Sequence, residues 1–458
     1  MRKIFLWIPL IILFSVPVII PLFHSEFFQS DDGEWMIIRF SAFHQALADG
    51  QFPVRFLGRL NYGYGYPVAD FLYPGFMYFG EIFKFLGFGF VSTIKIILGL
   101  SMIGSALFIF LWLSKIFSRW ASFVGSLLYL YVPYHLFDLY KRGSVGEILA
   151  LGIIPFIFWQ IERRSFFWTS VGIGFLILSH NTLALLFLPI IVIYLLTHSL
   201  ASAVYFLPSI FLGLGLSAFF WIPAIFDLQY TVFDKTKVSD FSDHFASLDL
   251  VGLSLLTVFV IVLLTFRRFD NSNYRTKMLM IFTGVAAVFL SLPISSFAWQ
   301  LLPSSFVQFP FRFLSITILS AAFLGALLID KIKGKKSFAI GVLFLILGFI
   351  SSFPYLSPAV FFDKGDSYYS TNEGTTTVKN EYMSVWVRDV PKEHFKEKVE
   401  IANGEIKDLV VKTNNISFLT DSKTNTTVTI NTIYFPGWMA KVDGKNVPIN
   451  YQNNKAIM

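Results

Sequence analysis

The sequence predicts an α-helical polytopic membrane protein with a small β-rich domain at its carboxyl end, and three observations support this fold class. Of the 458 residues, 55% are hydrophobic and only 14% are charged, whereas soluble domains carry about a quarter charged residues. Apolar runs long enough to cross a bilayer alternate with short basic loops, which is typical of multi-pass proteins. After residue 360 the sequence becomes polar and rich in Thr and Asn.

Eleven apolar segments are expected to be membrane-spanning helices. Arg2 and Lys3 place the amino terminus in the cytoplasm, and nearly every later cytoplasmic loop carries a basic cluster. The first segment is not followed by a small-residue cleavage site, so we interpret it as an uncleaved span. The odd number of spans places the carboxyl terminus outside. The expected helices cover residues 4–22, 91–113, 120–134, 147–160, 166–179, 182–197, 202–225, 248–265, 277–293, 312–329 and 337–353.

The segment between the first two helices, residues 24–90, is too polar and too rich in Gly and Pro for a simple span. It is expected to lie outside the membrane at the bilayer surface. We expect an amphipathic helix over 33–48, a Gly-Tyr loop over 61–67 and a second interfacial piece over 74–88.

The last part of the chain predicts a separate extracytoplasmic domain. Residues 361–458 show partial strand alternation in "TTVTINTIYF" and a hairpin signal at Asp443-Gly444. We therefore expect two domains, a transmembrane domain over 1–360 and a β-rich domain over 361–458.

The stretch "DDGEWMIIR" places two acids directly after the first apolar run. A carboxylate of Asp31 or Asp32 could accept a proton from an acceptor hydroxyl, and Arg39, about two turns further along a helix, could hold a departing phosphate. The alternative is structural: one aspartate caps the helix and Arg39 extends to lipid headgroups. From the residues alone, the two interpretations are about equally supported.

Further candidates lie in the other outer segments. Tyr64 and Tyr66 of the Gly-Tyr loop could stack on a sugar or could anchor the loop at the interface. Arg55, shortly before the loop, is a further candidate for substrate binding. Arg142 and Glu147 lie at the outer end of the fourth helix, where Arg142 could bind an anionic headgroup or form a salt bridge to Glu147.

Two candidates come from later loops. His180 lies at the outer end of the fifth helix, where a catalytic role competes with the commoner structural role of a single histidine. Arg312 begins the tenth helix beside Pro310 and is a second candidate for holding phosphate. Like Arg142, it is a basic residue on the outer side, against the usual charge bias of membrane proteins.

The motifs also resemble a known family. The stretches "DDGEWMIIRFSAFHQALADGQFPVRF", "NYGYGYPVADFLYPGFMYFGEIFKFLG", "YKRGSVGEILALGIIPFIFW", "LSHNTLALLFLP", "FFWIPAIFD" and "VQFPFRFL" are similar, in order, to bacterial membrane proteins of the 6-pyruvoyl-tetrahydropterin synthase-related family. The tail "YFPGWMAKVDGKNV" is similar to that of YfhO-type proteins. These families resemble the GT-C superfamily of glycosyltransferases.

The resemblance implies a fold and a reaction. GT-C enzymes use lipid-phosphate-linked sugars and keep an essential acidic pair in their first outer loop, so the resemblance implies that Asp31 or Asp32 is the catalytic base. The sequence departs from the family at Met36, where a His is frequent. Pterin synthase chemistry itself is disfavoured, because the seven His residues are widely scattered and the chain has no Cys.

The leading hypothesis is a membrane glycosyltransferase that moves a sugar from a polyprenyl-phosphate donor to a cell-envelope acceptor outside the membrane, by a single inverting displacement. No cofactor is required for this reaction; a carboxylate pair could bind a divalent metal, but none is predicted. Membrane lipids are expected partners and nucleic acid is not. The alternatives are a lipid or polysaccharide flippase, or a non-catalytic scaffold of envelope assembly.

Overall fold

The computed structural model describes residues 6–236, 241–265, 273–301 and 307–458. Arg2 and Lys3, together with part of the basic loop at 266–272, lie outside the described residues. The chain divides into two compact units. The first unit contains residues 1–34, 91–217 and 238–363, and the second contains residues 35–90, 218–237 and 364–458.

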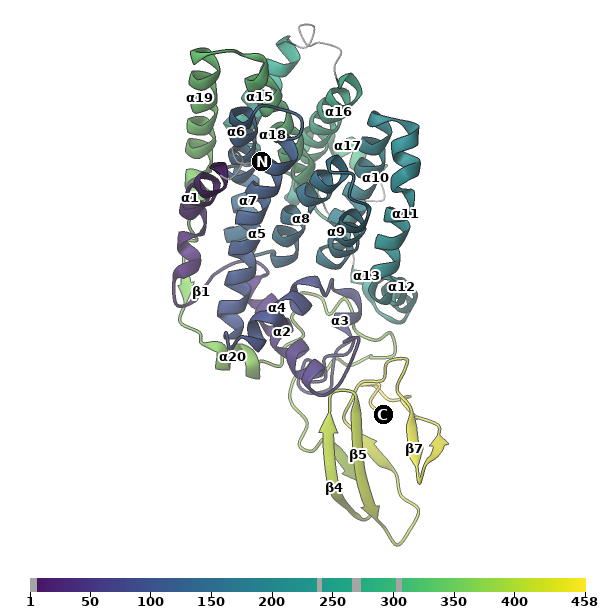
Figure 1. Ribbon diagram of the computed structural model, residues 1–458. Helices are drawn as coiled ribbons and strands as arrows, with labels where there is room; N and C mark the ends of the chain where they lie inside the picture. The colour runs from purple at the N-terminus through teal and green to yellow at the C-terminus, as the bar shows by residue number, and fades with distance from the viewer. Residues whose placement is uncertain (1–5, 237–240, 266–272, 302–306) are drawn as a thin grey trace. The chain divides into compact units, whose positions relative to one another are not determined.

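The first unit is helical, and Figure 1 shows its long helices running beside one another. Its principal helices are α1 (Trp7–Ile19), α5 (Phe90–Leu113), α6 (Arg119–Leu130), α8 (Val145–Glu162), α9 (Phe166–Ser179), α10 (Asn181–His198), α11 (Leu200–Leu216), α15 (Leu253–Thr265), α16 (Tyr274–Ser291), α18 (Leu314–Lys331) and α19 (Lys335–Ser352). Its short helical pieces are η1 (Ile20–Phe23), α7 (Pro133–Leu136), the π-helical turn η2 (Phe137–Arg142), η4 (Ser242–His244), α14 (Leu248–Val251), η6 (Pro293–Ser295), α17 (Ser296–Trp299), η8 (Pro310–Phe313) and η9 (Phe353–Tyr355).

The core of the first unit is centred on α18. Every side chain of this helix from Leu314 to Ile329 is buried, and α18 packs against α6, α15 and α16. The approach to α6 is close at Gly125, where an added Cβ would lie 2.7 Å from the backbone oxygen of Ala322. Small residues at such contacts let helix backbones approach in membrane proteins. A short antiparallel pair, β1 (Phe27–Phe28) with β2 (Phe361–Phe362), joins distant parts of the chain.

All eleven segments expected to be helical contain a helix in the structure. Five helices within the described ranges are long and apolar enough to cross a membrane, or up to seven if each of two bent pairs forms one span. Three shorter apolar helices and α6 account for the remaining segments. The several apolar helices of a membrane protein are thus confirmed, while the count of eleven spans and their sidedness stay predictions.

Two expected helices are each interrupted at a single residue. The segment 202–225 breaks at Ser217, between α11 and α12 (Ala218–Asp227). The segment 248–265 breaks at Gly252, whose backbone has φ +87°. Because this conformation ends a right-handed helix, α14 and α15 are separate helices.

The second unit combines the expected interfacial pieces with the carboxyl-terminal segment. The amphipathic helix has the predicted bounds, since α2 covers Gly33–Ala48, and the second piece is α4. The β-rich region is present, and its four two-stranded pieces include the predicted hairpin at Asp443-Gly444. The remaining elements are α3 (Val68–Phe71), α4 (Gly75–Phe85), η3 (Leu228–Tyr230), α13 (Phe233–Thr236), α20 (Asp366–Thr371), β3 (Val399–Ile401) with β6 (Val428–Ile430), β4 (Glu405–Lys412) with β5 (Asn415–Asp421), and β7 (Ala440–Val442) with β8 (Lys445–Val447).

The two units differ from the two expected domains in one respect. Residues 35–90 and 218–237 belong to the same compact unit as the carboxyl-terminal segment. Backbone hydrogen bonds show why, since the Ile433 amide donates to the Tyr64 carbonyl and the Tyr62 amide donates to the Glu373 carbonyl.

Candidate functional site

The acidic pair lies against the end of η2 in the first unit. The Asp31 amide donates to the Lys141 carbonyl at 3.0 Å, and the Asp32 amide donates to the Arg142 carbonyl at 2.8 Å. The side chains follow the same pairing: Asp31 lies 3.8 Å from the Lys141 ammonium, and Asp32 lies 3.2 Å from Arg142 Nη2. The hydroxyl of Ser30, rather than either carboxylate, accepts the bond from the Gly33 amide at the start of α2.

The two aspartates differ in exposure. The Asp31 side chain is 53% exposed and its partner Lys141 is 68% exposed. The Asp32 side chain is 29% exposed, while its partner Arg142 is only 5% exposed. Asp32 is thus a partly exposed carboxylate that forms an ion pair with a buried guanidinium.

Glu147, at the start of α8, contacts the buried basic side chains near Asp32. Its Oε1 atom lies 2.6 Å from Arg142 Nη1, 2.7 Å from Arg312 Nε and 3.4 Å from His180 Nε2. The Glu147 side chain is fully buried. A buried carboxylate with two guanidinium partners has its charge compensated, and each partner is fixed by the others. We call Asp32, Asp138, Arg142, Glu147 and Arg312 the Glu147 cluster.

Asp138 completes the Glu147 cluster. Its Oδ1 atom lies 3.0 Å from Arg142 Nη1, and the side chain is fully buried on η2. Burial, followed by the negative charge of Glu147, raises the pKa of Asp138 well above its usual value. The guanidinium groups of Arg142 and Arg312 therefore face the acidic side chains of Asp32, Asp138 and Glu147.

The chain can approach Asp32 closely because of one glycine. Gly143 follows η2 with φ +63° and ψ 30°, in the left-handed region that favours glycine. A Cβ at this position would collide with the Ser30 side chain and would lie 3.0 Å from the Gly33 Cα atom. Gly143 therefore lets the segment with the acidic pair lie directly against η2.

The expected salt bridge between Arg142 and Glu147 is thus present, and Arg312 shares it. Arg312 also donates to the Val307 carbonyl at 2.9 Å and to Gln308 Oε1 at 2.8 Å. His180 caps α10, because its Nδ1 atom accepts from the Leu183 amide at 3.3 Å. The structure brings Asp32, Arg142, Glu147, His180 and Arg312 together, although the two arginines that were expected to hold phosphate contact carboxylates.

Arg39 and Arg55 make their contacts within the second unit. Arg39 is buried, and its guanidinium donates to the backbone oxygen of Thr376 and, at 2.9 Å, to the Thr376 hydroxyl. Arg55 lies 3.5 Å from the Asp70 carboxylate. Burial and the charge of Asp227 raise the pKa of Asp70 to about 7, against the opposing effect of Arg55.

Tyr64 and Tyr66 form part of the core of the second unit. Tyr66 is fully buried, lies 3.1 Å from the Thr377 hydroxyl and accepts from the Tyr382 amide. Tyr64 is 4% exposed and packs edge-on against Phe395. The sequence left open whether these rings line a sugar site or anchor the loop at the interface; in the structure they lie in the interior of the unit.

Sequence reasoning overlooked Asp138. The available signal was its position four residues before Arg142, a spacing that places two side chains on one helical face. The overlooked rings of Phe309 and Phe311 cover Arg142 at 5.5 and 5.1 Å from its guanidinium carbon. Phe309 and Phe311 also carried a sequence signal, as neighbours of Arg312 in "QFPFR".

Comparisons with known proteins agree with this fold. A curated protein of Lactococcus lactis subsp. cremoris (strain MG1363), described as uncharacterized, is 24% identical over 334 residues, which cover 64% of this chain and 54% of that protein. The arabinofuranosyltransferase AftD from Mycobacteria has a TM-score of 0.51 at 15% identity, over 79% of this chain and 28% of AftD. ArnT from Cupriavidus metallidurans, solved with undecaprenyl phosphate, has a TM-score of 0.50 at 13% identity, over 74% of this chain and 62% of ArnT.

The chain thus spans between about a quarter and two thirds of the length of these proteins. Both solved structures are GT-C glycosyltransferases, so the expected resemblance to the GT-C fold is confirmed. The model of the membrane-protein family described as "6-pyruvoyl-tetrahydropterin synthase related domain" matches residues 72–358, more than half of the chain. This chain therefore belongs to the 6-pyruvoyl-tetrahydropterin synthase-related family of membrane proteins.

Proposed function

We propose that the protein transfers a sugar from a polyprenyl-phosphate donor to a cell-envelope acceptor on the extracytoplasmic side of the membrane, with Asp32 as the catalytic base. The observation that carries this proposal is the partly exposed Asp32 carboxylate, held 3.2 Å from buried Arg142. The GT-C fold supports the reaction class, and the ArnT structure with undecaprenyl phosphate supports the donor class.

In the proposed reaction, an Asp32 oxygen accepts the proton of an acceptor hydroxyl as that oxygen attacks the anomeric carbon of the sugar. The bond between the anomeric carbon and the phosphate oxygen breaks, and polyprenyl phosphate leaves as a stable anion. A general acid is not needed for such a leaving group, and the single displacement inverts the anomeric centre.

The other charged residues have different roles in this proposal. Arg142 positions Asp32 by direct contact, and Arg312 supports this arrangement through Glu147, which contacts both guanidinium groups. Lys141 is 68% exposed and lies beside the acidic pair, so it is the cation best placed for the donor phosphate. We propose that no metal is required, so transfer is expected to persist in the presence of EDTA.

The test uses a strain that lacks this gene and expresses a variant from a plasmid. Asp32→Asn should insert normally into the membrane but abolish the sugar modification, as measured by mass spectrometry of envelope polymers. Glu26→Gln is the matched control, because Glu26 is an acidic residue shortly before the pair whose carboxylate, among the described residues, has only a 3.9 Å ionic contact, to His24. It should retain the modification.

Asp31→Asn distinguishes the two aspartates and should retain partial activity. If the double variant Asp31→Asn/Asp32→Asn is inserted normally and keeps the full modification, the enzyme proposal is wrong. Transport or scaffolding would then be the better interpretation.

A further inference from the structure

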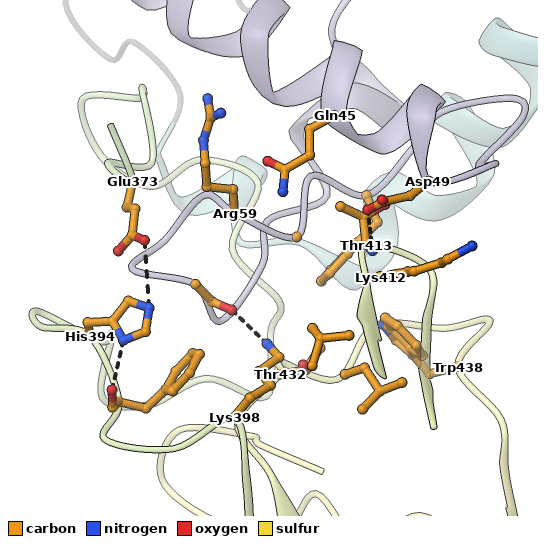
Figure 2. Close-up of a pocket in the computed structure, with 16 residues that line it drawn as sticks. Gln45, Asp49, Arg59, Glu373, His394, Lys398, Lys412, Thr413, Thr432 and Trp438 are labelled. Carbon is orange, nitrogen blue, oxygen red and sulfur yellow. Dashed lines mark hydrogen bonds and ion pairs between the residues drawn. The ribbon is translucent and has the colours of Figure 1, made fainter. Parts of the chain in front are cut away.

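A cavity of about 220 Å³ lies within the second unit, formed by α2, the Gly-Tyr loop and the carboxyl-terminal segment (Figure 2). Three of its charged residues are basic, Arg59, Lys398 and Lys412, and two are acidic, Asp49 and Glu373. The cavity is smaller than typical sites for drug-sized ligands. It therefore suits a single small group, such as one sugar residue, rather than a lipid chain.

Lys398 is a half-buried cation of this cavity that forms no ion pair with any residue in the described ranges. Its ammonium donates to the Gly63 carbonyl at 2.7 Å and to the Asn431 carbonyl at 2.8 Å, and within the described ranges no carboxylate lies within 4 Å of it. An ammonium has three donors, so one remains for a ligand. Burial lowers the pKa of Lys398 to about 8, because its surroundings do not compensate the charge.

The neighbouring charges are already engaged. Glu373 forms an ion pair with His394 at 3.6 Å, and Asp49 accepts from the Thr413 amide at 2.8 Å. The guanidinium of Arg59 points away from Lys398 in Figure 2 and donates to backbone and hydroxyl oxygens of α2 and the segment after α20. Lys412 is exposed, and its side chain extends away from Lys398 in Figure 2. An anion bound within the cavity would therefore have Lys398 as its half-buried cationic partner.

The rest of the wall has the chemistry of a sugar site. The buried hydroxyls of Thr413 and Thr432 line the cavity and have no hydrogen-bond partner in the structure's described part, and such groups are rare in folded proteins. Trp438 and Phe56, whose ring centroids are 5.7 Å apart, provide apolar surface. Aromatic surface accommodates the apolar face of a sugar ring, and hydroxyls bond to its polar edge.

We infer that this cavity binds an acidic saccharide, with the carboxylate or phosphate of the sugar on Lys398 and its ring against Trp438. The Gly-Tyr loop, residues 61–67, contributes to this site through the Gly63 carbonyl. With φ +80° Gly63 turns its carbonyl to Lys398, and a Cβ there would lie 2.9 Å from His394 Nε2. Binding here does not depend on the proposed transfer reaction, so the two can fail separately.

The experiment measures binding to the full-length protein in lipid nanodiscs by isothermal titration calorimetry. The probes are glucuronic acid, glucose 6-phosphate, glucose and inorganic phosphate. At least one acidic sugar should bind saturably, and about tenfold more tightly than glucose, because the charge-assisted bond to Lys398 is lost with a neutral ligand. The tighter of the two acidic sugars identifies the anion as carboxylate or phosphate.

Variants assign the binding to this cavity. Lys398→Met should weaken binding of the acidic sugar by about tenfold or more. The matched control is Lys407→Met, which removes the same charge from β4, where Lys407 pairs with Asp421 outside the cavity. If Lys398→Met does not fold, two other variants test the site. Lys398→Arg should retain binding of the acidic sugar, and Thr432→Val should weaken it.

Three results would overturn the inference. The first is that neither acidic sugar binds saturably, and the second is that Lys398→Met binds as tightly as the unmodified protein. The third is that inorganic phosphate binds as tightly as both acidic sugars, because the aromatic wall and the Thr hydroxyls would then contribute nothing.

Discussion

The Glu147 cluster in the first unit and the Lys398 cavity in the second unit differ in how their charged side chains are paired. In the cluster, Arg142 contacts three carboxylates and Glu147 contacts two guanidinium groups. In the cavity, Lys398 has only backbone carbonyls as polar partners among the described residues. Compensated charges hold one another in place, whereas an uncompensated charge is available to a ligand. The difference distinguishes residues that position a catalytic group from residues that bind a ligand.

The largest expected effect comes from removing the centre of the compensated cluster. Glu147→Gln leaves Arg142 and Arg312 buried without their shared carboxylate, which should lower the free energy of unfolding by about 3–5 kcal/mol. Denaturation of the purified protein in mixed detergent micelles measures it. Glu26→Gln, a change of the same type at a partly exposed site, should have little effect. Equal stability of the two variants would show that the cluster is not a stabilising network.

The next prediction tests whether Arg142 positions Asp32 or binds the donor phosphate. Arg142→Lys keeps the charge, but a single ammonium cannot reproduce the planar contacts to Asp32, Asp138 and Glu147. We expect the turnover number to fall by about 10²-fold, since small displacements of a catalytic group have effects of this size, with KM for the lipid donor unchanged. Steady-state kinetics measure both. A raised KM at unchanged turnover would mean that Arg142 binds the donor phosphate itself.

A smaller effect tests the close packing that holds the acidic pair. Gly143→Ala should destabilise the protein by about 1–3 kcal/mol, from the left-handed backbone conformation and from the collision with Ser30. Gly444, in the turn between β7 and β8, is the control, because it has φ +77° but nothing within 4 Å of an added Cβ. Gly444→Ala therefore experiences only the backbone strain of a positive φ. The difference in melting temperature between the two variants measures the packing contribution.

The smallest effect is a pH dependence at the uncompensated charge. The pKa of Lys398 is lowered to about 8, and only its ammonium form attracts an anion. Affinity for an acidic sugar should therefore be constant at lower pH and fall by about tenfold per pH unit above about 8. Lys398→Arg should remove this fall, as titration calorimetry at several pH values can show. The other charged or titratable residues that line the cavity are Asp49, Arg59, Glu373, His394 and Lys412.

Much of the fold could be predicted from local patterns. The bounds of α2 followed from the acidic start at Ser30 to Gly33 and the apolar residues after it, and the hairpin of β7 and β8 followed from Asp443-Gly444. These features depend on residues close together in the sequence, so they can be recognised from the sequence alone. The breaks at Ser217 and Gly252 were missed because a single small residue in an apolar run is a weak signal.

The order of residues was enough to predict the class of the protein, the helical segments and the position of the acidic pair after the first helix, because apolar length and local charge are local properties of the chain. Tertiary structure alone decided which charges meet. Arg312 lies 165 residues from Glu147 and Lys398 lies 335 residues from Gly63, and a pairing over such separations is set by packing of whole elements. For the same reason, only the structure distinguished the compensated Arg142 from the uncompensated Lys398.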